Sequence, residues 1–467
     1  MAQARPGAIA AWNGSATISP IAVLPVKAGR AALFAALLLV ASVAAPVHAA
    51  TTADTDHAAP GIAAIARAGC NAIALRVDAL PGNTPVLLRS YDSRRGQGAP
   101  TLPPLHSAAF TYDNALAVIA LLACGRRSQA ERIGEALRLA AVNDTRLRDA
   151  YHAGAVEGDQ PLPNGWWDAQ RKRWVDAAHQ YAGAYQDGTS CGNIAWTALA
   201  LLALHDATGE RRWRDAAVHL ADWVVTHASD TRGSAGFHGG VESYLLVPRN
   251  ASWKSTEHNI DLAAMFEWLA RISAPGGDWN AQARRARDFV AQQWDAASGH
   301  FWTGTEGDGV TPLRSPSALD VQLWAQLLPD APKAWRRALA WVERTHAVKG
   351  GFAFTDVRDG MWTEGTAQAA LAYRRTGDEA RAYTLLASIA RQASPGGFLY
   401  ATPQPRIAAL YSWYLHQPCL AATAWAVIAA SDRNPYLPGV PARIMSPAIK
   451  GHAARKPHGM LAIPHPR

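Results

Sequence analysis

One pattern occurs six times along this chain of 467 residues. In each copy a short polar cluster begins a helix rich in alanine and leucine, and a turn leads to a second helix rich in arginine and tryptophan. The six copies begin at Tyr112, Cys191, Thr256, Ser317, Trp362 and His416. Repeats of this length are typical of stacked helical hairpins, which bury a continuous core only when neighbours pack together. The sequence therefore predicts an all-α fold built from six hairpins.

Six hairpins can close into an (α/α)6 toroid, a ring of inner helices inside a ring of outer helices. All six polar clusters would then face one mouth of the ring. We expect the toroid to span residues 110–434. An irregular N-terminal segment, 50–109, should precede it, with a helix from Pro60 to Val77, and the Pro-rich basic tail 435–467 should be disordered.

The N-terminus has the pattern of an export signal. Lys27 and Arg30 precede the apolar run AALFAALLLVASVAAPV, and Val47-His48-Ala49 is a small-x-small cleavage pattern. We therefore predict that residues 1–49 are a signal peptide cleaved near Ala49, which places the mature protein in the periplasm or outside the cell. The alternative is an uncleaved membrane anchor.

Charge and motif content narrow the possible functions. The formal net charge is +8, but much of the excess lies in the N-terminal segment and the tail after Arg443, so no nucleic-acid partner is expected. The chain has no phosphate-binding loop, dinucleotide fingerprint, H-E-x-x-H, calcium loop or G-x-S-x-G elbow. We therefore expect neither a cofactor nor a metal.

Four cysteines follow the predicted leader: Cys70, Cys124, Cys191 and Cys419. Each lies in or beside an apolar helix, which favours buried free thiols. Export would also permit disulfides, and four cysteines allow three pairings. The pair to test first is Cys70 with Cys124.

The segments WKSTEHNID, GMWTEGTAQ and FTYDNALA, together with the repeat, resemble an exported bacterial family of the six-hairpin glycosidase-like superfamily. The resemblance covers about Phe110 to Asn434 and implies a carbohydrate-active enzyme. It transfers no catalytic residue, so the candidate residues come from the chemistry of the polar clusters.

Hydrolysis of a glycosidic bond needs two carboxyl groups, one to protonate the leaving oxygen and one to activate water or attack. The catalytic candidates are Glu257, Glu364, Asp113 and Asp320, which all fall near the start of predicted inner helices. Acidic residues are also common in any first helical turn, so Thr256-Glu257 and Thr363-Glu364 could be capping pairs instead.

Aromatic and polar residues near the mouth are candidates for binding sugar, because sugar rings stack on indole faces. The predicted substrate-binding residues are Tyr112, Trp167, Asp187, Trp253, His258, Trp302, Trp362, Trp413 and His416. Each tryptophan could instead pack a loop onto a helix, and each histidine could be structural. Asn114, Asn193 and Asn259 occupy corresponding positions, where we expect them to hydrogen-bond neighbouring loops.

These observations favour an exported glycoside hydrolase with Glu257 as general acid and Glu364 as base, Asp113 or Asp320 being the substitutes. Inversion is favoured, because carboxylates on different helices of a wide ring leave room for a water molecule. A polysaccharide lyase or sugar epimerase on the same fold is the alternative, and would depend on Tyr112, His258 and Arg406. A non-catalytic glycan-binding protein of the envelope is a third.

Overall fold

The computed structural model describes residues 61–92, 105–159, 161–168, 170–176, 185–243, 248–410 and 413–439. The predicted signal peptide, residues 1–49, and the end of the tail, 440–467, lie outside this part, so export stays a prediction. Within the described ranges no helix is long and apolar enough to cross a membrane.

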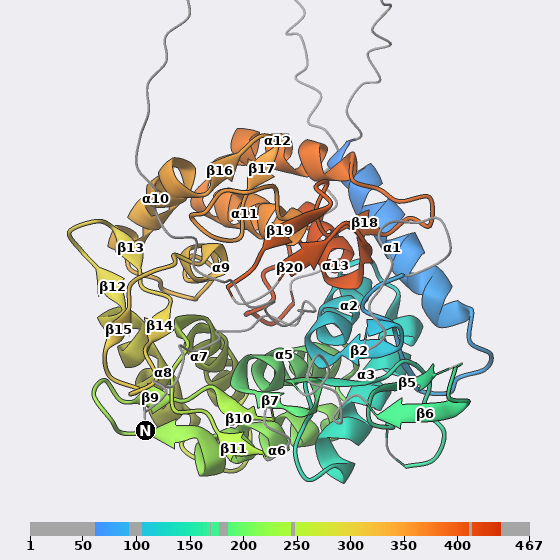
Figure 1. The fold of residues 1–467 in the computed structure, drawn as a ribbon. Coiled ribbons are helices and arrows are strands. Elements are labelled where there is room, and N and C mark those ends of the chain that lie inside the picture. Colours follow the sequence, from blue (N-terminus) through green and yellow to red (C-terminus); the bar gives the residue numbers. More distant parts are fainter. Residues whose placement is uncertain are drawn as a thin grey trace, which may run out of the picture.

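Six inner helices form a closed ring (Figure 1). They are α2 (Thr111–Ala123), α5 (Cys191–Thr208), α7 (Thr256–Arg271), α9 (Leu319–Trp324), α11 (Thr363–Thr376) and α13 (Leu420–Ala430). Each contacts the next along the chain, and α13 contacts α2, which closes the circle. Most residues on every side of these helices are buried, as their alanine- and leucine-rich sequence requires. The predicted (α/α)6 toroid is confirmed.

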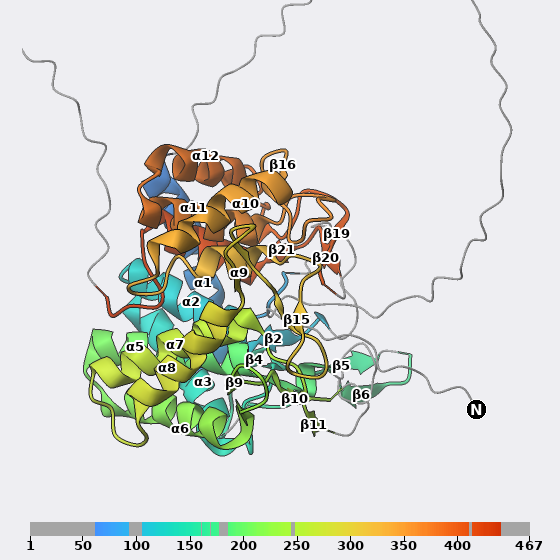
Figure 2. The same cartoon turned by 90° about the vertical axis from the view of Figure 1, so that its left-hand side faces the viewer.

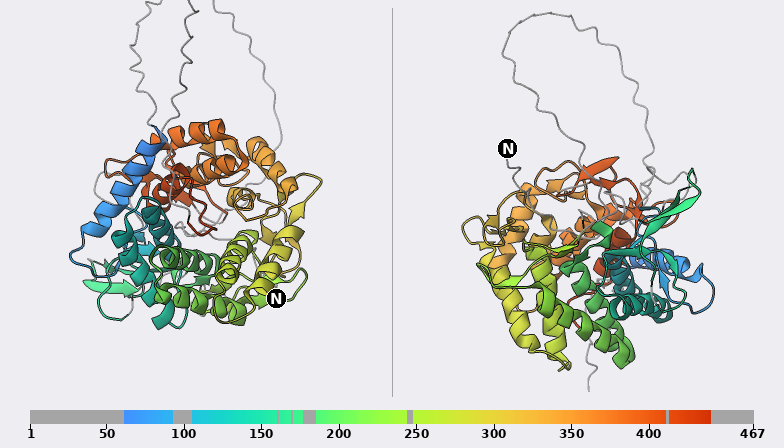
Figure 3. Two further views of the ribbon diagram at one scale, coloured as in Figure 1. Left: turned by 180° about the vertical axis from the view of Figure 1, so that it is seen from behind. Right: turned by 60° about the horizontal axis from the view of Figure 1, so that its bottom comes forward.

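Six amphipathic helices surround the inner ring (Figures 2 and 3). They are α1 (Ile62–Asp78), α3 (Arg127–Asn143), α6 (Arg211–Ala228), α8 (Trp279–Gln292), α10 (Arg337–Thr345) and α12 (Glu379–Ala390). Two short 3-10 helices, η3 (Tyr185–Asp187) and η4 (Lys333–Arg336), also occur in the described ranges.

Helix α1 corrects the predicted domain boundaries. The helix expected from Pro60 to Val77 is present, but it belongs to the ring, as the outer partner of α13. Gly69 makes this packing possible, because a Cβ there would lie 2.5 Å from Val427 of α13. The toroid therefore begins at α1, and the segment that precedes α2 is not irregular throughout.

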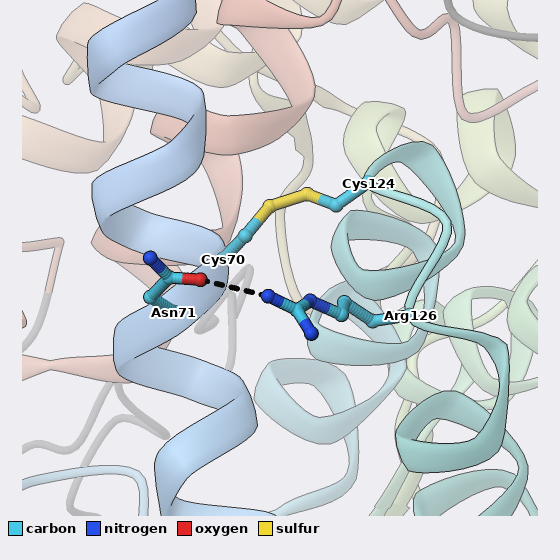
Figure 4. The surroundings of a disulfide bond; sticks show 4 residues. All are labelled: Cys70, Asn71, Cys124 and Arg126. Carbon is cyan, nitrogen blue, oxygen red and sulfur yellow. Dashed lines mark hydrogen bonds between the residues drawn. A yellow bond between two sulfur atoms is a disulfide. The ribbon is translucent and has the colours of Figure 1, made fainter.

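A disulfide between Cys70 of α1 and Cys124 fastens α1 to the end of α2 (Figure 4). Beside it, Arg126 donates a hydrogen bond to Asn71 at 3.0 Å. The expectation of free thiols is therefore wrong for Cys70 and Cys124, the pair that the sequence analysis put first for testing. It is confirmed for Cys191 and Cys419, which are free and buried.

The predicted tail also begins too early. Tyr436 is 1% exposed and belongs to the core, so the chain after α13 is ordered at least through the described residues to 439. Its ring packs against Trp196 at a centroid distance of 5.6 Å. Trp196 in turn contacts Tyr112, Trp324 and Trp425, with centroids 5.1–5.5 Å apart. This aromatic cluster joins α2, α5, α9 and α13 to the segment after α13.

The connections between helices contain short strands, all in antiparallel pairs or one three-stranded sheet within the described ranges. The pairs are β1 (Val86–Leu87) with β4 (Gly154–Ala155), β2 (Ala108–Phe110) with β3 (Ala150–His152), β5 (Gly165–Asp168) with β6 (Arg173–Asp176), β8 (Ser229–Asp230) with β9 (Gly236–Phe237), β12 (Trp294–Asp295) with β13 (His300–Phe301), β14 (Gly304–Thr305) with β15 (Pro312–Leu313), β16 (Ala347–Val348) with β17 (Gly351–Phe352), β18 (Leu399–Tyr400) with β21 (Pro418–Cys419), and β19 (Arg406–Ala408) with β20 (Trp413–Leu415). The sheet has the order β11 (Arg249–Asn250), β10 (Gly240–Glu242), β7 (Thr189–Ser190).

A polar side chain in the first turn of each inner helix binds the loop before it. In three hairpins an amide pairs with both the N–H and the C=O of one residue: Asn114 with Leu88, Asn259 with Phe237, and Gln322 with Phe301. In two others a hydroxyl accepts the N–H: Thr366 from Phe352, and Thr423 from Leu399. In the sixth, Asn193 donates to Asp149 at 2.8 Å. The expected role of the asparagines is confirmed.

Replacing Asn259 by alanine should destabilise the ring. It removes three buried hydrogen bonds of 2.8–3.0 Å and leaves the amide and carbonyl of Phe237 without their partner. We expect a loss of about 3 kcal/mol in the free energy of unfolding, measured by chemical denaturation. Asn280→Ala, at an exposed position of α8, is the control and should change stability little. Equal effects of the two variants would contradict the role given to Asn259.

Replacing both Cys70 and Cys124 by serine should also destabilise the protein. The bond closes a loop with a sequence separation of 54 residues. Its loss should lower the free energy of unfolding by about 2–4 kcal/mol, because the unfolded chain gains freedom. Denaturation with and without a reductant provides the check: reduction should bring the wild type to the level of the double variant and leave that variant unchanged.

Candidate active site

Four carboxyl groups lie in the first turns of four inner helices. Glu257, Asp320 and Glu364 are the second residues of α7, α9 and α11, and Asp113 is the third residue of α2. All four are at most 2% exposed. Glu257 interacts electrostatically with Asp320 and Glu364, and Glu364 interacts with Asp113. The structure thus brings the four predicted catalytic residues together at one end of the ring.

Glu257 lies in an environment that favours its neutral form. Burial raises the pKa of this carboxyl well above its usual range, and the charges of Asp320, Asp261 and Glu364 raise it further. Its Oε1 is buried without a hydrogen-bond partner in the described part of the chain. A carboxyl that keeps its proton near neutral pH can act as a general acid.

Glu364 lies in a different environment, because two side chains donate to its Oε1. The Tyr112 hydroxyl donates at 2.7 Å and Gln368 at 3.3 Å. Trp425 in turn donates to the Tyr112 oxygen at 2.8 Å. Burial raises the pKa of Tyr112 well above its usual range, so this phenol stays a donor. Donors of this kind stabilise a carboxylate, which suits a base.

Neither Thr256-Glu257 nor Thr363-Glu364 supplies the side-chain cap of its helix in the structure. The hydroxyl of Ser255 caps α7 by accepting the N–H of His258 at 3.3 Å. Thr256 donates to the carbonyl of Trp302 at 2.7 Å. Glu364 Oε1 receives its bonds from side chains rather than from the first turn of its helix.

Asp113 is a third carboxyl with a perturbed pKa. Burial raises this pKa well above its usual range, the nearby Ser90 hydroxyl lowers it, and the charge of Glu364 raises it. Its carboxyl lies near Glu364, on the side of the ring where α2 meets α13. Asp113 is thus a substitute that interacts with Glu364, while Asp320 is the neighbour whose charge affects Glu257 most.

The sequence interpretation missed Asp261, which lies one helical turn beyond Glu257 on α7. Asp261 is fully buried and accepts a hydrogen bond of 2.6 Å from the Tyr436 hydroxyl. A signal was present, because residues four apart lie on the same helix face and TEHNIDLAA places an acid there in an otherwise apolar stretch.

His258 directly follows Glu257 in α7, and its ring packs near that of Trp253. His258 is buried against Gly192 of α5, where a Cβ would lie 2.7 Å from its Cδ2. Its ring is 5.7 Å from that of Trp253. The Trp253 indole donates to Glu242 at 2.6 Å and is 6% exposed. Both side chains are therefore buried at the start of α7.

The other tryptophans divide into two groups. Trp362 is fully buried between Phe354 and Tyr414, which favours the packing alternative over sugar binding. Trp302 and Trp413 are half-buried, each beneath an arginine, Arg314 at 4.9 Å and Arg406 at 4.4 Å from the ring centroid. Trp167 lies in β5, but its side chain is outside the described residues.

Two further candidates have structural partners. Asp187 forms ion pairs with Arg146 and Arg148, which anchor the loop before α5. His416 Nδ1 lies 2.7 Å from the carbonyl of Thr402, and its ring stacks on Tyr400 at 4.0 Å. These contacts favour a structural role for both. Among the described side chains, no three His, Cys, Asp or Glu residues are grouped so that they could hold a metal ion.

Solved structures with the same architecture cover most of this chain. A glycosidase has a TM-score of 0.55 at 14% identity, covering 80% of this chain and 98% of its own. An alpha-amylase from Clostridium perfringens has a TM-score of 0.53 at 9% identity, covering 78% and 97%. A D-mannose isomerase has a TM-score of 0.51 at 12% identity, covering 81% and 99%.

Neither a protein-family model nor a curated protein matches the chain. At such low identities the structural likeness shows the fold alone. The chain shares its (α/α)6 toroid fold with these solved structures.

Proposed function

We propose that the protein is an exported glycoside hydrolase that cleaves an oligosaccharide or polysaccharide. The observation that carries the proposal is the contrast between two neighbouring carboxyls: burial and negative neighbours favour the neutral form of Glu257, whereas Glu364 accepts hydrogen bonds from Tyr112 and Gln368. Pairs of carboxyls with opposed environments are what acid–base hydrolysis requires. The glycosidases among the similar structures support the same reaction class.

In the proposed reaction, Glu257 protonates the leaving oxygen and Glu364 activates a water molecule on the opposite face of the sugar. These residues lie on α7 and α11, which α9 separates in the ring. This spacing favours inversion. His258 and Trp253 are proposed to contact the sugar, because His258 follows Glu257 in α7 and its ring lies 5.7 Å from that of Trp253.

A sugar isomerase or epimerase is the second candidate, because a D-mannose isomerase shares the fold. Such an enzyme would use His258 as its base, with Tyr112 near the reacting carbon. Arg406, the third residue of this alternative, lies on β19 against Trp413. A screen against polysaccharides and free aldoses separates the candidates: a hydrolase releases new reducing ends, an isomerase converts one sugar into another, and a lyase gives products that absorb in the ultraviolet.

Glu257→Gln should lower hydrolysis of natural glycans by about 10²–10⁴-fold, because it keeps the shape of the side chain but removes the transferable proton. Aryl glycosides with good leaving groups, if accepted, should lose much less. Turnover and melting temperature are measured on the same preparations.

The matched control is Glu379→Gln, which changes an exposed acidic residue in the first turn of the outer helix α12. It should cost less than about 1 kcal/mol and leave turnover intact. If Glu257→Gln behaves in the same way, Glu257 is not the general acid.

A further inference from the structure

The chain after α13 closes the end of the ring opposite the carboxyl mouth. Asn434 donates to the carbonyl of Leu327, which follows α9, at 2.7 Å. The amide of Gly439 donates to Asp206, near the end of α5, at 2.7 Å. Between these anchors Tyr436 is buried along the axis and reaches Asp261. The C-terminal segment thus contacts the inner ring from the side where its helices end.

Asp261 and Glu257 form a close pair of acids. Residues at i and i+4 of a helix have Cβ atoms about 5–6 Å apart, and both side chains are at most 2% exposed. Glu257 Oε1 and Asp261 Oδ2 are both buried without a hydrogen-bond partner among the described residues. Two such carboxyls cannot both be charged at low cost, so once the pair has released one proton, the two groups share the other.

Hydrogen-bond donors determine which carboxyl holds this proton. Burial raises the pKa of Asp261 well above its usual range, and two donors lower it in part: the Tyr436 hydroxyl, which has the larger effect, and the nearby Trp196 indole. Burial also raises the pKa of Tyr436 well above its usual range, so its hydroxyl remains a donor whenever the carboxyls titrate. The bond therefore favours an ionised Asp261, whose charge in turn favours a neutral Glu257.

We propose that Tyr436 is a positioning residue for the site. By donating a hydrogen bond to Asp261, it keeps the shared proton on Glu257, which is the carboxyl of the pair nearer the start of α7. The inference rests on the proposed function only where Glu257 is named as general acid. Proton placement itself is independent of any reaction.

The other charged groups that affect Glu257 are the same in the wild type and in each variant compared. Asp320 of α9 and Glu364 of α11 raise its pKa, and both remain unchanged in the variants. Tyr112 of α2 also interacts with Glu257, and Trp196 of α5 is a second donor beside Asp261; both are unchanged in the variants. A change in the titration of Glu257 is therefore attributable to Tyr436 or Asp261.

The test is a carboxyl titration that needs no substrate. The full protein is labelled with ¹³C at the glutamate side-chain carboxyls, and Glu257→Gln identifies the Glu257 resonance. In Tyr436→Phe the proton should move toward Asp261, so the Glu257 midpoint should fall by about one pH unit. Asp261→Asn removes the repelling charge and should also lower it.

Tyr373→Phe is the matched control, because Tyr373 donates to Glu343 at 2.7 Å in the same way but outside the cluster. It should leave the Glu257 midpoint unchanged. A folded Tyr436→Phe protein with the wild-type midpoint overturns the inference, as does an equal shift in Tyr373→Phe. If Tyr436→Phe does not fold, Asp261→Asn decides: an unchanged midpoint overturns the proposal.

Activity separates this inference from the proposed function. If the wild type cleaves a glycan, the alkaline limb of turnover, where the general acid loses its proton, should move to lower pH in Tyr436→Phe. If the midpoint moves and the wild type cleaves nothing, proton placement stands and the hydrolase proposal fails. If the wild type hydrolyses a glycan and the Glu257 midpoint does not move in Tyr436→Phe, the hydrolase proposal stands and the inference about proton placement fails.

Discussion

The architecture depends on one repeated interaction, the hydrogen bond between the first turn of each inner helix and the loop before it. The side-chain amides of Asn114, Asn259 and Gln322 each hydrogen-bond both the N–H and the C=O of one buried loop residue, as a neighbouring β-strand would. They can do so because an amide offers a donor and an acceptor together. Buried backbone groups need such partners, since an unpaired one costs about 1–3 kcal/mol. These bonds fix where each inner helix begins, and hence where the second and third residues, the carboxyls, lie.

The same geometry explains why the carboxyls have unusual pKa values. Fixing the helix starts side by side in the ring buries Glu257 near Asp320 and Glu364. In a solvent-exposed helix, acidic residues of the first turn would interact mainly with the helix dipole. Here burial is the largest cause of each shift, and the neighbouring charges add to it. Because the fold buries carboxyl groups close together at one end of the ring, it gives them the raised pKa values that a general acid needs.

The parts of the fold that repeat were predictable, and the parts that occur once were not. Each hairpin carries its own period and polar cluster, so the ring and the grouping of Asp113, Glu257, Asp320 and Glu364 follow from local sequence. The place of α1 does not, because its partner α13 lies more than 300 residues away and no local pattern records it. Tyr436 lies in a Pro-rich segment that resembles a tail, and its burial depends on the space inside the finished ring. The sequence predicts that Trp362 binds sugar, because aromatic type alone does not distinguish a surface from a core position.

Helix α1 also has a consequence for the order in which the molecule is assembled. As the chain leaves the ribosome, α1 emerges first and its inner partner α13 emerges last, so the ring cannot close until nearly all of the chain exists. Contacts between such distant segments are slow to form, because a long loop must close first. The Cys70–Cys124 bond joins α1 to α2, which is already present at that stage. Once this bond has formed, it holds α1 beside α2 and α3. Helix α13 can then pack against an α1 that is already in place.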